Sequence, residues 1–91
     1  MRRTVKKVID GDTIVVNRKI GDTNKIRLAR VNAPERGKSG GRKATNILRG
    51  LVGGKSITLT PKGRSYDRVV AEVWVGRKSV NKRMNEKLRR K

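Results

Sequence analysis

The sequence predicts a small domain of mainly β (α+β) class, a five-stranded β-barrel with two helices packed on it. Short runs of β-branched and other apolar residues recur along the chain, separated by Gly, Asp and Pro. Two segments change to an apolar spacing of three and four residues, which is typical of helices. The 91 residues are enough for one hydrophobic core, so residues 1–91 are interpreted as a single domain.

The first half of the chain predicts an antiparallel meander of three strands, at residues 3–9, 13–16 and 26–33. The sequence Asp10-Gly11-Asp12 separates the first two, and Gly11 allows a sharp bend or bulge there. The third strand is expected to end near Ala33, because Pro34 has no N–H and keeps the preceding residue extended.

The second half predicts a helix at 42–52, a strand at 56–60, a turn at 61–63, a strand at 68–75 and a last helix capped by Ser79. The charged tail, residues 87–91, is expected to fray. Trp74 is assigned to the core or to a barrel rim. This order of elements matches a barrel of the OB type. The predicted core is Val5, Ile14, Leu28, Ile47, Leu48, Leu51, Ile57, Leu59, Val73 and Met84.

The charge balance points to a polyanionic partner. There are 26 Lys and Arg against 7 Asp and Glu, a net charge of +19. Nucleic acid is the favoured partner, and an anionic membrane surface is the less favoured one, because the cations are spread over the whole chain. No apolar run is long enough to span a membrane, and a cytoplasmic location is expected. The absence of Cys and His excludes thiol nucleophiles, imidazole bases and the usual zinc sites.

Two groups of side chains could carry chemistry. Arg27 and Glu35 stand at the two ends of the third strand, where they could hold a phosphate and activate a water. Alternatively, they are a solvated strand residue and a loop charge. Asp12, the side-chain oxygen of Asn32 and a neighbouring backbone carbonyl could form an oxygen-only site for a hard cation. Arg68 adds a second arginine from the last barrel strand.

Three separated motifs, in this order, resemble the staphylococcal (micrococcal) nuclease family, the thermonucleases. They are Val8-Ile9-Asp10-Gly11-Asp12-Thr13, then Ile26-Arg27-Leu28 with Val31-Asn32-Ala33-Pro34-Glu35, then Tyr66-Asp67-Arg68-Val69-Val70-Ala71-Glu72-Val73 followed by Ser79-Val80-Asn81. The resemblance runs from about Val5 to Leu88. It implies calcium-dependent hydrolysis of phosphodiester bonds in DNA and RNA, leaving 3′-phosphate ends, with Mg²⁺ or Mn²⁺ as possible substitutes.

The resemblance also implies roles for individual residues. Arg27 and Arg68 match the arginines that hold the scissile phosphate. Glu35 matches the glutamate that orients or deprotonates the attacking water, although its role as base is debated. The remaining matches are Asp12 as a direct calcium ligand, Asp10 as a carboxylate acting through water, Ala33 as a ligand through its backbone carbonyl, and Tyr66 as a contact to the adjacent phosphate.

The chain departs from the family pattern at three positions. Asn32 replaces a second calcium-binding aspartate, so the metal site is expected to bind more weakly or to prefer another metal. Ala33 replaces a threonine and removes a hydroxyl. Asp67 replaces a common glycine and is expected to draw the Arg68 guanidinium away from substrate. The family's third helix and its pocket tyrosines have no counterpart in the chain.

Three functional readings follow. The first is a small, monomeric, metal-dependent nuclease. The second is a catalytically weak, basic OB-fold module that binds DNA or RNA, and the third is an assembly protein that neutralises nucleic acid. The remaining acidic residues are assigned structural roles only. Glu72 and Glu86 are expected to form surface ion pairs, and Asp22 is expected to lie in a turn. The nuclease reading requires Arg27, Arg68, Glu35 and a cation held by oxygen atoms to converge on one concave site of the barrel. It fails if Arg27 and Arg68 lie on opposite sides of the molecule, or if Asp12 is too distant from Asn32 to share an ion.

Overall fold

Eight elements follow one another in a computed structural model of the chain, which describes residues 1–89. They are β1 (Arg2–Asp10), β2 (Thr13–Ile20), β3 (Thr23–Leu28), α1 (Gly41–Val52), β4 (Ser56–Ser65), β5 (Arg68–Val75), β6 (Lys78–Ser79) and α2 (Val80–Arg89). Every predicted strand and helix is present, with shifted boundaries. Within this part of the chain, no helix is both long and apolar enough to cross a membrane.

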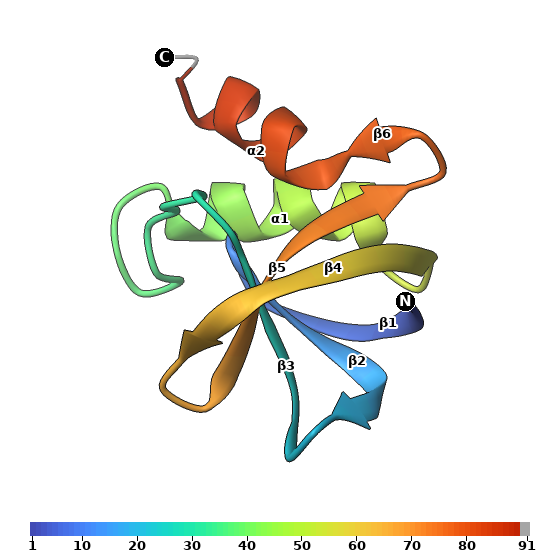
Figure 1. Cartoon of the computed structure of the whole chain (residues 1–91). Helices are drawn as coiled ribbons and strands as arrows, with labels where there is room; N and C mark the ends of the chain where they lie inside the picture. The colour runs from blue at the N-terminus through green and yellow to red at the C-terminus, as the bar shows by residue number, and fades with distance from the viewer. Residues whose placement is uncertain (90–91) are drawn as a thin grey trace.

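Strands β1 to β5 form a closed barrel. Antiparallel pairs join β3 to β2, β2 to β1, β1 to β4 and β4 to β5. The ring closes through a parallel pair between β3 and β5, with Ile26 opposite Val69 and Leu28 opposite Ala71. Figure 1 shows the barrel with both helices at one end. The predicted five-stranded OB-type barrel with two helices is therefore confirmed, and β6 is a short additional strand on β5.

The core fills the barrel and the space beneath the helices. Ile14, Ile26, Leu28, Leu59 and Val73 are fully buried. Burying each such side chain contributes about 1.5–3 kcal/mol. The predicted core residues Ile47 and Leu51 are only partly buried, because they lie at the margin of the α1 face whose centre is formed by Ala44, Leu48 and Val52. Trp74 is half-buried at the start of the β5–β6 hairpin, a rim position.

The third strand ends earlier than predicted. The ladder of β3 stops at Leu28, and Arg30 has a left-handed backbone with φ of 60°. Ala29 still donates its N–H to the carbonyl of Ala71 at 2.9 Å. The chain then turns at Arg30, so the prediction that Pro34 ends this strand was wrong. Residues 31–35 form an irregular segment instead.

The turn predicted at residues 61–63 was also wrong. Strand β4 continues through Pro61 to Ser65, with a register irregularity between Pro61 and Gly63. A bulge tolerates proline because one residue there lies outside the regular ladder. The β4–β5 turn falls at Tyr66 and Asp67, where Tyr66 has φ of 57°.

The last helix is longer than the charge pattern predicted. Ser79 caps it by accepting a hydrogen bond from the Lys82 N–H at 3.2 Å, as expected. The helix continues to Arg89, so residues 87–89 of the predicted frayed tail are helical; residues 90–91 lie outside the described residues. Leu88 packs against the core and provides the physical reason.

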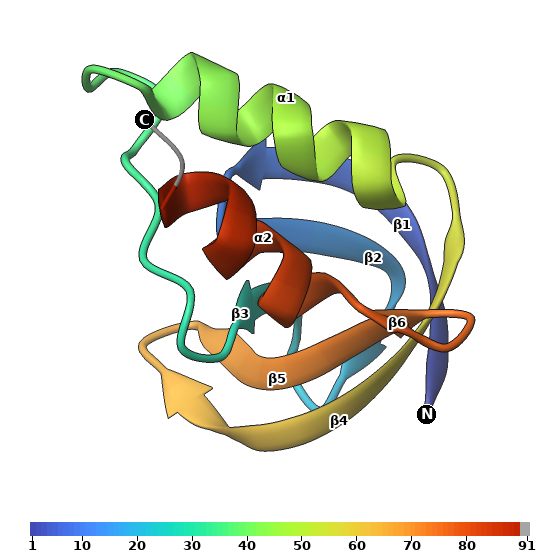
Figure 2. The same ribbon diagram turned by 90° about the horizontal axis from the view of Figure 1, so that it is seen from above.

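Asn81 joins α2 to the barrel. Its amide nitrogen donates to the carbonyls of Ala29 and Ala71 at 2.9 and 3.1 Å, and its oxygen accepts from the Val73 N–H at 2.8 Å. Figure 2 shows α2 lying across the barrel end beside α1. The side chain of Asn81 is 2% exposed. This one amide therefore fixes the end of β3, from which the irregular segment 31–35 begins.

Candidate active site

Arg27 lies at the centre of a polar cluster on the barrel. Strand β3 holds its side chain half-buried, with 20% of it exposed. One guanidinium nitrogen donates to the Leu28 carbonyl at 2.9 Å, and the other donates to Asn32 Oδ1 at 3.0 Å. The second nitrogen also lies 3.6 Å from Asp12 Oδ2. The guanidinium is thus oriented by three groups, and it brings Asp12 and Asn32 to the same nitrogen.

The Asp10–Asp12 turn supplies two carboxylates to this cluster. The Asp12 N–H donates to Asp10 Oδ1 at 3.2 Å, and Asp12 itself is buried. Asp12 Oδ1 accepts from the Thr13 hydroxyl at 2.9 Å, while Oδ2 lies 3.4 Å from the Ala33 N–H. Partial burial raises the pKa of Asp10, and the neighbouring Asp12 carboxylate raises it further. The Asp10 and Asp12 carboxylates therefore lie close together at this turn.

Gly11 allows this turn to approach its neighbours. A Cβ atom at Gly11 would lie 2.6 Å from the Ala33 Cβ and 2.7 Å from the Ala44 Cβ. Gly11 is not among the residues with positive φ, so close packing rather than a special backbone angle requires glycine here. The turn is consequently held against both the 31–35 segment and α1.

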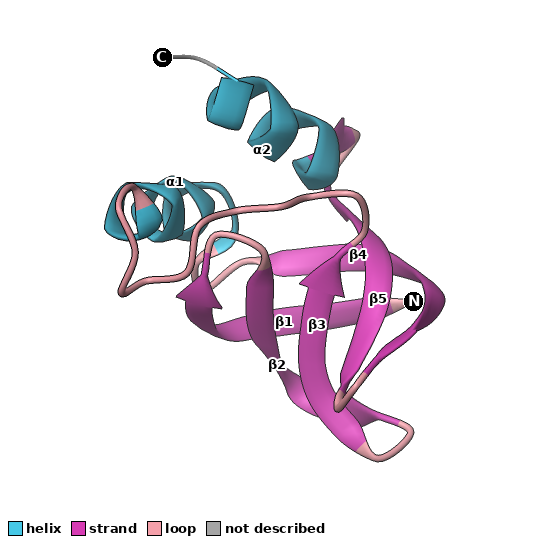
Figure 3. Cartoon of the chain, turned by 90° about the vertical axis from the view of Figure 1, so that its left-hand side faces the viewer, coloured by secondary structure: helices cyan, strands magenta, loops and turns pink. Residues whose placement is uncertain are grey.

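Arg68 reaches the same cluster from the neighbouring strand. Its guanidinium donates to the Thr13 hydroxyl at 3.1 Å, and that hydroxyl donates to Asp12. Figure 3 shows β3 and β5 side by side, which agrees with their parallel pairing. Thr13 is also opposite Arg27 in the β2–β3 ladder. The structure therefore brings Arg27, Arg68, Asp12 and Asn32 together on one side of the barrel. Glu35, which the nuclease reading also requires there, makes no hydrogen bond to this cluster among the described residues.

The family model described as staphylococcal nuclease homologue matches residues 25–88. The chain belongs to this family. It is 36% identical over 81 residues to an uncharacterized endonuclease of Haemophilus influenzae, covering 88% of this chain and 46% of that protein. An uncharacterized endonuclease of Escherichia coli is 40% identical over 74 residues, 77% of this chain and 46% of the relative.

A thermonuclease of Staphylococcus intermedius is 34% identical over 87 residues, covering 85% of this chain and 51% of that protein. The chain therefore spans about half the length of the curated relatives that it matches. The resemblance in motifs to the staphylococcal nuclease family is thus confirmed, together with the fold that it implies.

Glu35 of this staphylococcal nuclease homologue lies outside the hydrogen-bonded cluster. Its carboxylate is exposed and makes no hydrogen bond or ion pair with the residues that the structure describes. Its backbone is well anchored, because its carbonyl accepts from the Lys38 N–H at 2.9 Å. A Cβ at Gly41 would lie 1.7 Å from that carbonyl oxygen, so only glycine lets α1 begin beside Glu35.

The oxygen atoms of the cluster fit a hard cation better than a transition metal. Asp10 and Asp12 supply carboxylates and Asn32 an amide oxygen, whereas for Ala33 the group near Asp12 is the N–H. The described residues contain no group of three or more His, Cys, Asp or Glu side chains that could bind a metal ion. Arg27 already uses oxygens of Asp12 and Asn32. This set of oxygen donors is suited to Ca²⁺ or Mg²⁺, although Arg27 reduces the negative charge that the donors offer to the ion.

Residues of the β4–β5 turn differ from expectation. Asp67 binds Lys25 at 3.1 Å, and this contact lowers the pKa of the Asp67 carboxyl. The expectation that Asp67 draws Arg68 away was wrong, because Arg68 bonds to Thr13 instead. Tyr66 is 93% exposed at the turn. It has no hydrogen bond to the cluster, so its contact with nucleic acid stays a prediction.

The remaining acidic residues are also placed. Asp22 lies in the β2–β3 turn as expected, and Arg64 pairs with it at 2.6 Å. Glu72 forms the predicted ion pair, with Arg30, although the Glu72 side chain is buried rather than on the surface. For Glu86 the prediction was wrong: it is exposed and forms no ion pair with any residue from 1 to 89.

Sequence reasoning missed three positions that shape the site. Thr13 was assigned to a strand and quoted in a motif, but its hydroxyl connects Arg68 to Asp12. Gly41 precedes the predicted helix at 42–52 and received no role, and Asn81 was quoted only as part of a motif. None carried a local signal for these roles, because each role depends on a residue distant in the sequence.

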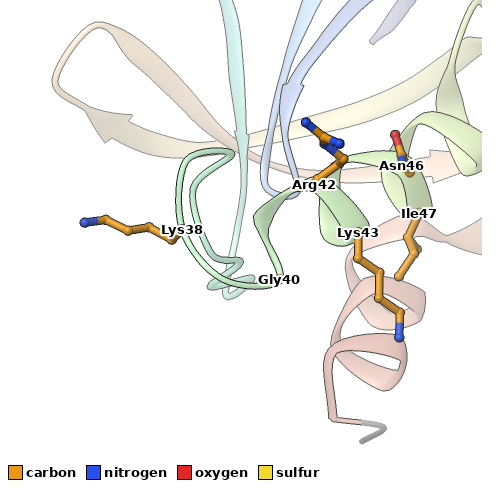
Figure 4. A pocket seen from close by; sticks show the side chains of 6 residues that line it. All are labelled: Lys38, Gly40, Arg42, Lys43, Asn46 and Ile47. Atoms are coloured by element: carbon orange, nitrogen blue, oxygen red, sulfur yellow. The ribbon is translucent and has the colours of Figure 1, made fainter.

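A separate hollow lies at the beginning of α1. Figure 4 shows its lining side chains, Lys38, Arg42, Lys43, Asn46 and Ile47, together with Gly40. Its volume is about 620 Å³. None of the residues of the polar cluster lines it, so it is not the candidate active site.

Proposed function

We propose that this domain is a metal-dependent nuclease that hydrolyses phosphodiester bonds of DNA, RNA or both. The observation that carries the proposal is the convergence of Arg27 and Arg68 on the Asp12–Thr13 pair. Two guanidinium groups held by neighbouring strands can bind the oxygens of one phosphate and stabilise the charge that develops on it. Family membership and the endonuclease names of the relatives support the same reaction.

Arg27 remains able to bind a phosphate in this arrangement. A guanidinium has five N–H donors, and Arg27 uses two of them in hydrogen bonds to Leu28 and Asn32, which leaves three. The bonds that it makes also keep its plane fixed, so little conformational entropy is lost when the phosphate binds. Arg68 uses one donor, to Thr13, and leaves four.

Glu35 is the proposed general base or water-orienting group. Its carboxylate is exposed, and its backbone is held between Lys38 and Gly41, two residues beyond the Ala33 N–H that lies near Asp12. With no histidine in the chain, a carboxylate is the natural acceptor for the proton of an attacking water.

The proposed metal is Ca²⁺, with Mg²⁺ or Mn²⁺ as alternatives. Asp12, Asn32 and the Ala33 carbonyl would hold it, and Asp10 would act through water. When bound, such an ion neutralises phosphate charge and polarises the scissile bond. The position of Asp12 and Asn32 at the same Arg27 nitrogen supports this assignment, because it brings a carboxylate and an amide oxygen to one place.

The test compares Arg27→Ala and Arg68→Ala with Arg64→Ala, which removes an arginine of the Asp22 ion pair away from the cluster. Cleavage of labelled single-stranded DNA would be followed in calcium, magnesium and chelator. We expect the first two variants to lose about 10²–10³ in rate, the control to stay near wild type, and chelator to stop cleavage. Wild-type protein that binds DNA but never cuts it would overturn the proposal.

The second candidate function is a catalytically weak nucleic-acid-binding module. Asn32 favours it, because its oxygen carries no formal charge and accepts a hydrogen bond from Arg27. In that case all three arginine variants bind DNA, and neither they nor the wild type cleaves it.

A further inference from the structure

Two basic hollows lie near the carboxyl end of α1. The first hollow, of about 440 Å³, is lined by Lys6, Lys7, Arg36 and Arg49, with Gly53 and Gly54. The second hollow, of about 450 Å³, is lined by Lys55, Arg77, Lys78 and Arg83, with Gly50 and Gly76. Both hollows include residues of the α1–β4 connection, where Lys55 directly follows Gly54. We call them together the cationic track.

Among residues 1–89, the cations of the track form no ion pair with an acidic residue. No carboxylate lines either hollow. The ion pairs of the described residues use Lys25, Arg27, Arg30 and Arg64, none of which belongs to the track. Like charges gathered without counter-charges repel one another unless an anion is bound between them.

The track extends away from the candidate active site. Arg36, which lines the first hollow, directly follows Glu35, whereas Arg77, which lines the second, lies in the β5–β6 turn beside the carboxyl end of α1 (Figure 2).

We propose that the cationic track is a second nucleic-acid contact surface, which binds the phosphate backbone of a polynucleotide without reading its sequence. It deepens the proposed function by naming the substrate class as long polynucleotides held beyond the cleavage point. Glycines 50, 53, 54 and 76 leave the hollows open, so long Lys and Arg side chains can reach phosphates from several directions. A membrane surface is less suitable, since the exposed large hydrophobic residues, Met1 and Tyr66, are outside the track.

The experiment measures binding alone, in chelator, so that cleavage does not enter. A labelled duplex of about 30 base pairs covers the track with margin at both ends. The variant Lys55→Gln/Arg77→Gln/Lys78→Gln removes three exposed cations of the track. Its matched control, Arg18→Gln/Lys19→Gln/Lys62→Gln, removes two lysines and one arginine that are equally exposed on β2 and β4. Thermal unfolding checks that both variants fold.

The track variant is expected to lose about tenfold or more in affinity for the duplex at low salt. The slope of its log binding constant against log salt concentration should become less steep by about 3. The control should change the slope by about 1 or less. A second track variant, Lys6→Gln/Lys7→Gln/Arg49→Gln, should show the same losses. It replaces the first track variant in the comparison with the control if the first track variant does not fold. Equal losses in track variants and control would overturn the proposal, because binding would then be diffuse.

Two further experiments distinguish polynucleotide binding by the track from lipid binding and from nuclease activity. Vesicles of phosphatidylserine and phosphatidylcholine replace the duplex in the first experiment, and loss of vesicle binding with unchanged duplex binding would overturn the proposal in favour of a lipid surface. Cleavage is measured separately in the second experiment. A wild-type protein that does not cut but shows the difference between track variant and control refutes the proposed function and supports the track.

Discussion

Asn32 has one contact in the structure and one proposed role. Its side-chain oxygen accepts a hydrogen bond from Arg27, and the same oxygen is the proposed metal ligand. As an amide, it orients the guanidinium without adding negative charge beside Asp12. Under the proposed function, Asn32 would therefore orient Arg27 for phosphate at the expense of metal affinity.

Asn32→Asp should tighten calcium binding by about tenfold, ~1.4 kcal/mol, because it adds a carboxylate to the donor set. Isothermal titration of the protein with calcium measures this change. Asn46→Asp, at an exposed position on α1, is the control for a simple gain of one negative charge. Equal calcium affinity in both variants would show that residue 32 is not a ligand.

Asp10 gives the stability of the domain a specific pH dependence. Its pKa is raised in the folded state, first by burial and then by Asp12. As the pH falls, Asp10 therefore binds a proton at a higher pH in the folded protein than in the unfolded chain. The stabilisation that comes with this proton is fully present at low pH and is lost as the pH rises through the folded pKa. Asp10→Asn removes the negative charge that is partly buried beside Asp12, so the variant should be more stable than wild type at pH 7 in chelator.

Urea unfolding at pH 7 and at pH 4 measures the effect, and the advantage of Asp10→Asn should shrink at the lower pH. Added calcium should favour the wild type instead, if Asp10 assists the metal through water. If Asp10→Asn is less stable than wild type at pH 7 in chelator, the Asp10 carboxylate does not destabilise the folded protein through burial and repulsion by Asp12.

At the scale of elements, the start of α1 sets the position of Glu35. Gly41→Ala places a methyl group on the Glu35 carbonyl, and the backbone must move. We expect a loss of about 1–3 kcal/mol in stability and a drop in cleavage rate. Gly50→Ala in the same helix is the control: nothing lies within 4 Å of its Cβ, and alanine there should stabilise by about 0.4–1 kcal/mol. Thermal unfolding and cleavage assays of both variants decide the point.

Helix α2 acts on the site through Asn81. Asn81→Ala leaves the Val73 N–H and the Ala29 carbonyl without the partners that Asn81 provided, whereas the Ala71 carbonyl keeps the Ala29 N–H. Two buried polar groups left unsatisfied cost about 1–3 kcal/mol each. We expect a loss of about 2–4 kcal/mol in urea unfolding. Asn46→Ala, which removes only an exposed contact to Arg49, should stay within about 0.5 kcal/mol of wild type.

At the scale of the whole molecule, the net charge of +19 opposes folding. Salt screens this repulsion, so the Tm should rise between about 0.01 and 0.5 M NaCl, over which the Debye length falls several-fold. The variant Arg18→Gln/Lys19→Gln/Lys62→Gln should show a smaller rise. Differential scanning calorimetry measures both, and a Tm that falls with salt would show that the surface ion pairs outweigh the repulsion.

The sequence by itself determined the number, type and order of the main elements. Alternating apolar residues, the helical spacing at residues 42–52 and the turn signals at Asp10–Asp12 are local patterns, and local patterns are enough to predict strands and helices. The residues of the candidate site were also named from the sequence, by the motifs that resemble the family. The absence of His and Cys left a carboxylate, Tyr66 or a lysine for proton transfer.

Only the tertiary structure decided how these parts meet. Arg68 and Thr13 are 55 positions apart and Asp67 and Lys25 are 42 apart, and closure of the barrel brings each pair together. Strand β4 passes Pro61 because β5 pairs with it on both sides of the bulge. Segment 31–35 leaves the barrel at Arg30, where Asn81 holds the preceding carbonyl. Such contacts depend on the register between distant strands, which no local pattern encodes.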